Sequence, residues 1–168
     1  QAGDSVTTGS GHNAIFGYFA ATSLTTGPFN TALGASSFRH ETTGQYNTAV
    51  GYSALEHQVG ANDNVAVGFK AYEGVEGSTT GGNNTAIGTY ALQVSTTGAN
   101  NTAVGYEVLT ANTTGSDNIA VGAWTLDANT TGTRNVAMGT HALGANTTAN
   151  DNTAFGNNAL ATNTTGSN

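Results

Sequence analysis

The sequence has no cysteine and little charge. Without cysteine, neither a disulfide nor a zinc–thiolate site can form. Only 8% of the residues are charged, and three Lys and Arg stand against ten Asp and Glu, which gives a formal net charge of −7. Arg39, Lys70 and Arg134 lie far apart in the sequence, whereas a surface that binds nucleic acid needs several clustered cations. We therefore expect neither nucleic acid nor an anionic membrane surface among the partners.

Proline and long apolar runs are scarce as well. There is one proline, and no window approaches the roughly 18 apolar residues that a membrane-spanning helix needs. Residues 1–11 lack the layout of a signal peptide, and the chain begins with Gln1, so we expect a mature product or an excised fragment. With 37% hydrophobic residues and 24 glycines, the composition favours ordered structure built from small side chains rather than a disordered tail.

One short phrase, Asn-x-Ala-apolar-Gly, recurs along the whole sequence, with Ile15 in the Ala place of the first copy. Its Asn, which we call the anchor, recurs at Asn13, Asn30, Asn47, Asn64, Asn84, Asn101, Asn118, Asn135 and Asn152. The spacing is 17 residues except for one step of 20, and the three extra residues fall within residues 73–78. A fixed period of this kind indicates a repeat architecture. We predict that residues 1–168 form a single repeat domain in which the insertion loops out without changing the register.

The local sequence favours short strands over helices. Gly lies inside every unit, and Gly, Thr and Asn are weak helix formers. A Thr-Thr-Gly phrase precedes most anchors and is typical of a turn. At roughly 3.3 Å per residue, one coil has a contour of about 56 Å, which suits two short strands joined by two turns. The sequence therefore predicts an all-β fold, a parallel β-roll (β-solenoid) of about nine 17-residue coils.

Stacking turns each repeat position into a column. Two residues after the anchor comes Ala and four after it comes Gly; because both share one strand face, the two layers of the roll are expected to approach closely there. Between them, an apolar column must point to the opposite face: Phe16, Leu33, Val50, Val67, Ile87, Val104, Val121, Met138 and Phe155. A strand with two apolar faces is usually buried on both. We therefore predict a homo-oligomer whose axis runs along the solenoid.

Two further columns have structural interpretations. A second apolar column, four residues after the Gly, fills either the far edge of the roll or the same interface: Phe38, Leu55, Tyr72, Leu92, Leu109, Leu126, Leu143 and Leu160. Asn tolerates turn conformations, and identical amides stacked one coil apart can bond along the stack. We expect the anchors to form such an Asn ladder rather than a ligand site.

The units at residues 47–55 and 113–122 resemble the YadA-like head repeats of trimeric autotransporter adhesins and of related tail-fibre and surface proteins of phages and bacteria. They read Asn-Thr-Ala-Val-Gly-Tyr-Ser-Ala-Leu and Thr-Thr-Gly-Ser-Asp-Asn-Ile-Ala-Val-Gly, and the resemblance covers essentially the whole chain. It implies a left-handed roll, three copies side by side, and an extracellular place on a cell or virion surface. The implied role is attachment to host cells, matrix or glycans.

Exposed aromatic residues are the best candidates for ligand contact. Four follow the Gly directly, namely Tyr18, Tyr52, Phe69 and Tyr106. Tyr90 and Trp124 lie two after it, in a column whose other members are largely polar and therefore expected at the surface. Aromatic rings of this kind stack on sugars or anchor a protein partner. We select Trp124 and Tyr90 as contact residues, while the Tyr52 column could equally complete the oligomer core.

Metal binding and catalysis have little support in the sequence. His40 and His57 stand 17 residues apart and should stack, where they could share a metal ion with Glu41 or Glu56, but exposed turn residues explain them better. Arg39 should pair with Glu56 at the surface. No Ser-His-Asp set, cysteine nucleophile or phosphate loop can be argued. We predict a protein that is not an enzyme and has no cofactor and no metal site.

Other features leave alternatives of lower rank. Asp63, Asp117 and Asp151 occur in only some units, unlike the Asp of calcium-binding nonapeptides. Turn chemistry explains the glycosylation sequons at Asn83, Asn100, Asn112, Asn129, Asn146 and Asn163. The Thr pairs raise an ice-binding hypothesis, which ranks below attachment because outward rows need Thr at alternate positions. A self-assembling extracellular filament with head-to-tail stacking is the closer alternative, since the last coil lacks a polar cap.

Overall fold

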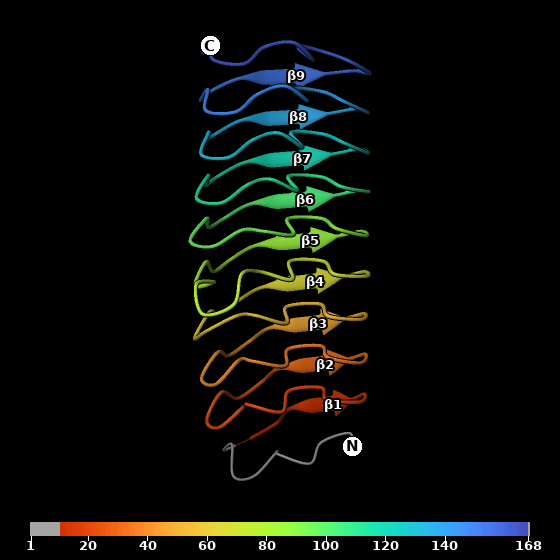
Figure 1. The fold of residues 1–168 in the computed structure, drawn as a ribbon, viewed down its shortest axis with the longest axis vertical. Helices are drawn as coiled ribbons and strands as arrows, with labels where there is room; N and C mark the ends of the chain where they lie inside the picture. The colour runs from red at the N-terminus through yellow and green to blue at the C-terminus, as the bar shows by residue number, and fades with distance from the viewer. Residues whose placement is uncertain (1–10, 168) are drawn as a thin grey trace.

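The computed structural model describes residues 11–167, which form one solenoid. Its nine three-residue strands pair in chain order into a single parallel sheet (Figure 1): β1 (Ala14–Phe16), β2 (Thr31–Leu33), β3 (Thr48–Val50), β4 (Val65–Val67), β5 (Thr85–Ile87), β6 (Thr102–Val104), β7 (Ile119–Val121), β8 (Val136–Met138) and β9 (Thr153–Phe155). No membrane-spanning helix occurs in the described range. The predicted all-β parallel solenoid is confirmed, while the outer bounds of the predicted domain, residues 1 and 168, lie outside the described residues.

Neighbouring strands pair at the repeat spacing, including across the insertion. Ala49 pairs with Ala66 in the regular part of the stack, and Ala66 pairs with Ala86 across the longer coil. The extra residues form a turn in which Gly74 and Gly77 have φ of 81° and 70°. The insertion therefore loops out without changing the register, as predicted.

Each coil contributes one strand, not the two that the sequence predicted. In the coil that contains β3, Ser53, Leu55 and Asp63 adopt left-handed conformations with φ of 53°, 52° and 59°, and the same positions do so in other coils. For a non-glycine residue this costs about 1–2 kcal/mol. Backbone hydrogen bonds between coils offset the cost: the Ser53 N–H donates to the Ala35 carbonyl at 3.0 Å, and the Leu55 N–H to the Ala71 carbonyl at 3.2 Å.

The Gly column is required by the approach of successive coils rather than by the two layers of the roll, which corrects the sequence-based expectation. Gly51, directly after β3, has φ of 133°, and a Cβ there would lie 2.3 Å from the carbonyl oxygen of Gly68 in the next coil. The Ala column does face the interior as expected, since Ala49, Ala66 and Ala86 are fully buried. Gly thus ends each strand, while Ala lines the core.

The second apolar column fills the interior of the solenoid in all its coils but the last, where Leu160 is 50% exposed, and this decides between the two places that the sequence left open. Phe38, Leu55 and Leu109 are fully buried, so each such coil supplies one large side chain to a narrow core. Tyr72 takes this position in the coil of β4, where its hydroxyl donates to the Gly81 carbonyl at 2.9 Å and accepts from Asn84 Nδ2 at 3.1 Å. A thin core of this kind leaves most other side chains at the surface.

The anchors form the predicted Asn ladder. Asn118 is fully buried; its Nδ2 donates to Asn101 Oδ1 at 3.1 Å and to the Gly132 carbonyl at 2.9 Å. Its Oδ1 accepts from the backbone N–H and the Nδ2 of Asn135 at 3.0 and 3.1 Å. The interpretation of the anchors as structural residues is confirmed.

Candidate functional site

The apolar column lies on the outer side of the sheet, as the alternation of side chains along a strand requires. Its members at the strand ends are well exposed, with 47% for Leu33, 40% for Ile87 and 39% for Met138, whereas Val50 and Val104 are half-buried between neighbours. The same strand face also carries the residue directly after each anchor, which is Thr, Val or Ile in β2 to β9. The outer face of the sheet is therefore uncharged from β1 to β9.

The aromatic residues beside this face stack on one another. Tyr52 and Phe69 stack at 5.4 Å between ring centroids, and Tyr90 meets Phe69 edge-on at 5.5 Å. Half of the Tyr52 surface is exposed, while Tyr90 is half-buried. The Tyr52 ring thus has one face covered by Phe69, while Tyr90 lies perpendicular to Phe69.

Trp124 is exposed, as its polar column predicted, but its neighbours restrict its contacts. His141 stacks on it at 5.1 Å, nearly parallel, and Tyr106 lies edge-on at 5.4 Å. Its Nε1 donates to Glu107 Oε2 at 2.9 Å. The structure does not bring Trp124 and Tyr90 together, since Glu107 occupies the coil between them. A ligand would meet the rim of this group rather than a free indole face.

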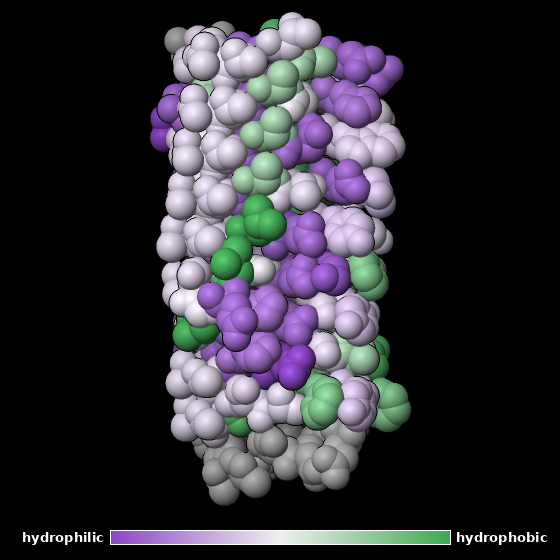
Figure 2. All heavy atoms as spheres, in the orientation of Figure 1, coloured by the Kyte–Doolittle hydropathy of each residue, from purple (hydrophilic) through white to green (hydrophobic). Residues whose placement is uncertain are grey.

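A charged corner follows β2, β3 and β4, and we define it as Arg39, His40, Glu56, His57, Lys70 and Glu73. The His40 and His57 rings stack at 5.0 Å, and Arg39 Nη1 lies 3.4 Å from Glu56 Oε1, so both predicted neighbour pairs are confirmed. Burial, the charge of His57 and the charge of Arg39 together lower the pKa of His40. Figure 2 shows hydrophilic side chains gathered on the lower half of the visible face, at the level of these coils.

Glu73 belongs to this corner although sequence reasoning did not select it, and Glu41 does not. Glu73 Oε1 accepts from Lys70 Nζ at 2.8 Å, and its Oε2 accepts from Gln93 Nε2 at 2.9 Å. Glu73 follows Glu56 by 17 residues, as Glu56 follows Arg39. The repeat spacing could therefore have identified Glu73 from the sequence.

The Glu41 carboxylate points into the solenoid, which excludes it as a partner of the two histidines. Its Oε1 accepts backbone N–H groups of Thr42, Thr43 and Gly44 at 2.7–2.8 Å, and that of Gly60 at 2.8 Å. The side chain is fully buried. Glu41 therefore closes a turn, at the repeat position where later coils carry Asn112 and its equivalents.

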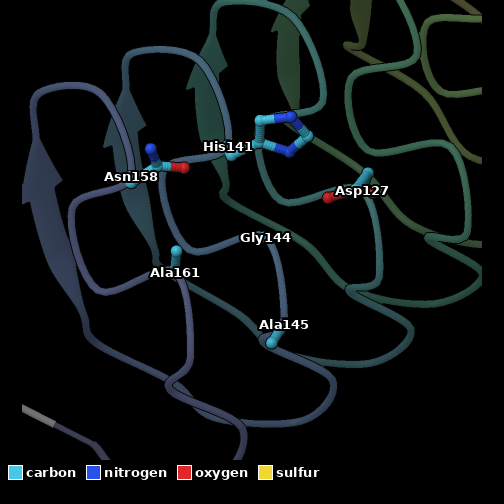
Figure 3. Close-up of a pocket in the computed structure, with 6 residues that line it drawn as sticks. All are labelled: Asp127, His141, Gly144, Ala145, Asn158 and Ala161. Atoms are coloured by element: carbon cyan, nitrogen blue, oxygen red, sulfur yellow. The ribbon is translucent and has the colours of Figure 1, made fainter.

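A shallow hollow of about 380 Å³ lies further along the solenoid, lined by Asp127, His141, Gly144, Ala145, Asn158 and Ala161. Figure 3 shows the Asp127 side chain below the His141 ring, with Asn158 on the following coil. The hollow exists because Gly144 and Ala161 continue a column that holds larger side chains elsewhere. Burial raises the pKa of Asp127, whose buried Oδ1 makes no hydrogen bond within residues 11–167.

Three of the sequon residues and several of the Thr pairs have structural roles. Asn112, Asn129 and Asn146 are fully buried and form a second ladder, in which Asn129 Nδ2 donates to Asn112 Oδ1 at 2.9 Å. The sequence analysis did not recognise this ladder. In the Thr pairs, the first hydroxyl bonds to the next coil, as when Thr113 Oγ1 donates to the Thr130 carbonyl at 3.0 Å. The second Thr of this pair, Thr114, is exposed and its hydroxyl makes no hydrogen bond within residues 11–167.

Comparison with models of known protein families, with curated proteins and with solved structures found no match. The functional proposals below therefore rest on the residues and on the geometry of the solenoid.

Proposed function

We propose that this chain is a structural and attachment module of an extracellular fibre, an adhesin or a phage receptor-binding fibre. In this proposal, copies associate side by side through the outer face of the sheet, and their remaining surface contacts host cells, matrix or glycans. The observation that supports it best is the exposed apolar column running from Phe16 to Phe155. Large contiguous apolar surfaces on soluble proteins are typical of interaction sites.

A second copy of the chain is the partner that best fits this face. The face spans nine strands, or about 40 Å at the usual strand spacing, and offers only Ala, Thr and apolar side chains. Two such faces would meet without burying an unpaired charge, which is the main penalty at interfaces. The resemblance to adhesin heads favours three copies.

Sedimentation velocity tests the association. We expect the chain to sediment as a trimer and the double variant Val67→Lys, Val104→Lys to sediment as a monomer with an unchanged circular dichroism spectrum. The matched control places lysines on exposed turn residues, Thr97→Lys and Thr114→Lys, and should remain trimeric. A monomeric wild-type chain would contradict the proposal, and long threads would favour the filament alternative.

Attachment is tested by screening the chain against glycans and host surfaces. Trp124→Ala and Tyr90→Ala should weaken binding if the rims of these rings contact the ligand, and an unchanged signal in both would remove them from the site. Failure to bind any surface, together with thermal hysteresis and ice shaping, would favour the ice-binding alternative.

A further inference from the structure

The charged corner is the strongest local departure from the repeat. Only 8% of the residues in this protein are charged, yet Arg39, Glu56, Lys70 and Glu73 occupy one corner of three successive coils, together with both stacked histidines. Stacking alone does not require these side chains, because the equivalent positions elsewhere hold residues such as Thr110, Gly144 and Ala161. A feature confined to a few coils indicates a local role.

Three side chains of this corner converge as metal ligands do. One nitrogen of His57 and one carboxylate oxygen each of Glu56 and Glu73 lie within 4.8 Å of one another. A tetrahedral zinc ion, with ligands at about 2.1 Å, places neighbouring ligand atoms about 3.4 Å apart. Small side-chain rotations can close this difference, since Glu56 and His57 lie on one turn and Glu73 lies on the next coil.

A second observation at the same place is an unpaired nitrogen. His57 Nδ1 is buried and has no hydrogen-bond partner in the part of the chain that the structure describes. Buried polar atoms in folded proteins are nearly always paired, so an unpaired nitrogen on this histidine is consistent with a bound water or ion at this corner. The stacked His40 ring holds the imidazole plane of His57 in place.

We propose that Glu56, His57 and Glu73 bind one divalent cation of the zinc type, with a fourth position left to water or to an external ligand. A mixed set of imidazole nitrogen and carboxylate oxygen suits zinc, whereas calcium and magnesium take oxygen ligands. Lys70 Nζ, 2.8 Å from Glu73 Oε1, holds the carboxylate when the cation is absent. Bound at this carboxylate, the cation takes the place of Lys70 as the partner of Glu73.

Calorimetric titration of the chelator-treated full chain with zinc chloride tests the site, with thermal unfolding as a second readout. We expect one zinc ion per chain and a higher melting temperature with zinc. His57→Gln and Glu73→Gln should each weaken binding at least about tenfold. His141→Gln is the matched control, because His141 also stacks on a ring, at 5.1 Å, but lies outside the cluster; it should bind zinc like the wild type.

The Lys70→Met variant distinguishes a cation-binding site from a corner held together by ion pairs alone. Removing the competing ammonium frees Glu73, so zinc affinity should rise by up to about fivefold. Absence of zinc binding by the wild-type chain overturns the proposal, as does wild-type affinity in folded His57→Gln and Glu73→Gln. Weaker binding in Lys70→Met would also overturn it. Circular dichroism establishes that each variant is folded, and Glu73→Gln carries the test should His57→Gln unfold.

Discussion

Replacing the central anchor Asn118 by Ala tests how much the Asn ladder contributes to stability. The substitution removes four hydrogen bonds, but three of the partners keep another bond. Asn101 Oδ1 still accepts from the backbone of residue 118, the Gly132 carbonyl from Asn129, and Asn135 Nδ2 still donates to Ala149. The backbone N–H of Asn135 is left without a partner within residues 11–167.

The expected loss of stability follows from which hydrogen-bonding groups keep a partner and which do not. A buried amide left without a partner costs about 1–3 kcal/mol, and each of the other lost bonds adds about 0.5–1 kcal/mol. We therefore expect Asn118→Ala to lower the free energy of unfolding by about 2.5–6 kcal/mol, a large share of the 5–15 kcal/mol typical of a domain. Urea unfolding followed by circular dichroism measures the loss, and hydrogen exchange at the Asn135 amide reports it locally.

Two further variants show whether the amide or only the packed volume matters. Asn157→Ala changes an exposed Asn that makes no side-chain hydrogen bond in residues 11–167, so stability should change by at most about 0.5 kcal/mol. Asn118→Asp keeps the shape but turns a donor into an acceptor facing two carbonyl oxygens. Its loss should exceed that of Asn118→Ala at neutral pH and shrink in acid. Equal urea midpoints for Asn118→Ala and Asn157→Ala would refute the ladder as a source of stability.

Three other substitutions test the core, the hollow and the Gly column. Tyr72→Phe should lower the free energy of unfolding by about 1–3 kcal/mol. Burial raises the pKa of Tyr72 to about 12, so the stability of the wild type should fall as the pH rises from about 10 towards that value. Urea titrations at these pH values should show a smaller fall for the variant. Burial also raises the pKa of Asp127, so its ionised form opposes folding. Asp127→Asn should raise the melting temperature at neutral pH, and this gain should vanish below about pH 4. Gly51→Ala should destabilise the chain far more than Gly156→Ala. Both residues have positive φ, but a Cβ at Gly51 would meet atoms of the next coil, whereas a Cβ at Gly156 would have nothing within 4 Å. Equal losses of melting temperature by calorimetry would contradict this.

The period of the sequence was enough to predict the stack, the register and the outward direction of the apolar column. These properties depend only on equal residues lying one coil apart, so the insertion after Glu73 could not disturb them. The Asn ladder followed from the same logic, because an amide can bond to an identical amide above it.

The sequence did not predict the path of the chain between strands. Ser53 and Leu55 adopt left-handed conformations that neither residue prefers, and hydrogen bonds to neighbouring coils together with burial hold them there. The second strand was expected from the contour length of a 17-residue coil, and that length does not reveal left-handed residues that bend the chain. The inward carboxylate of Glu41 was missed for a similar reason: its partners are backbone N–H groups, which no side-chain pattern reveals.

The apolar column and the charged corner differ in their length along the solenoid, and this difference supports a different role for each. Positions that face another coil are constrained by the residue one repeat away, as Gly51 is by Gly68, so their residue types report stacking. Side chains that point outward from the coils are less constrained by the residue one repeat away. A residue pattern that recurs at outward positions therefore needs an explanation other than stacking. The apolar column runs through all nine strands, which suits contact with a partner of equal length. The charged corner spans three coils around Glu56 and Glu73, which suits a single small ligand.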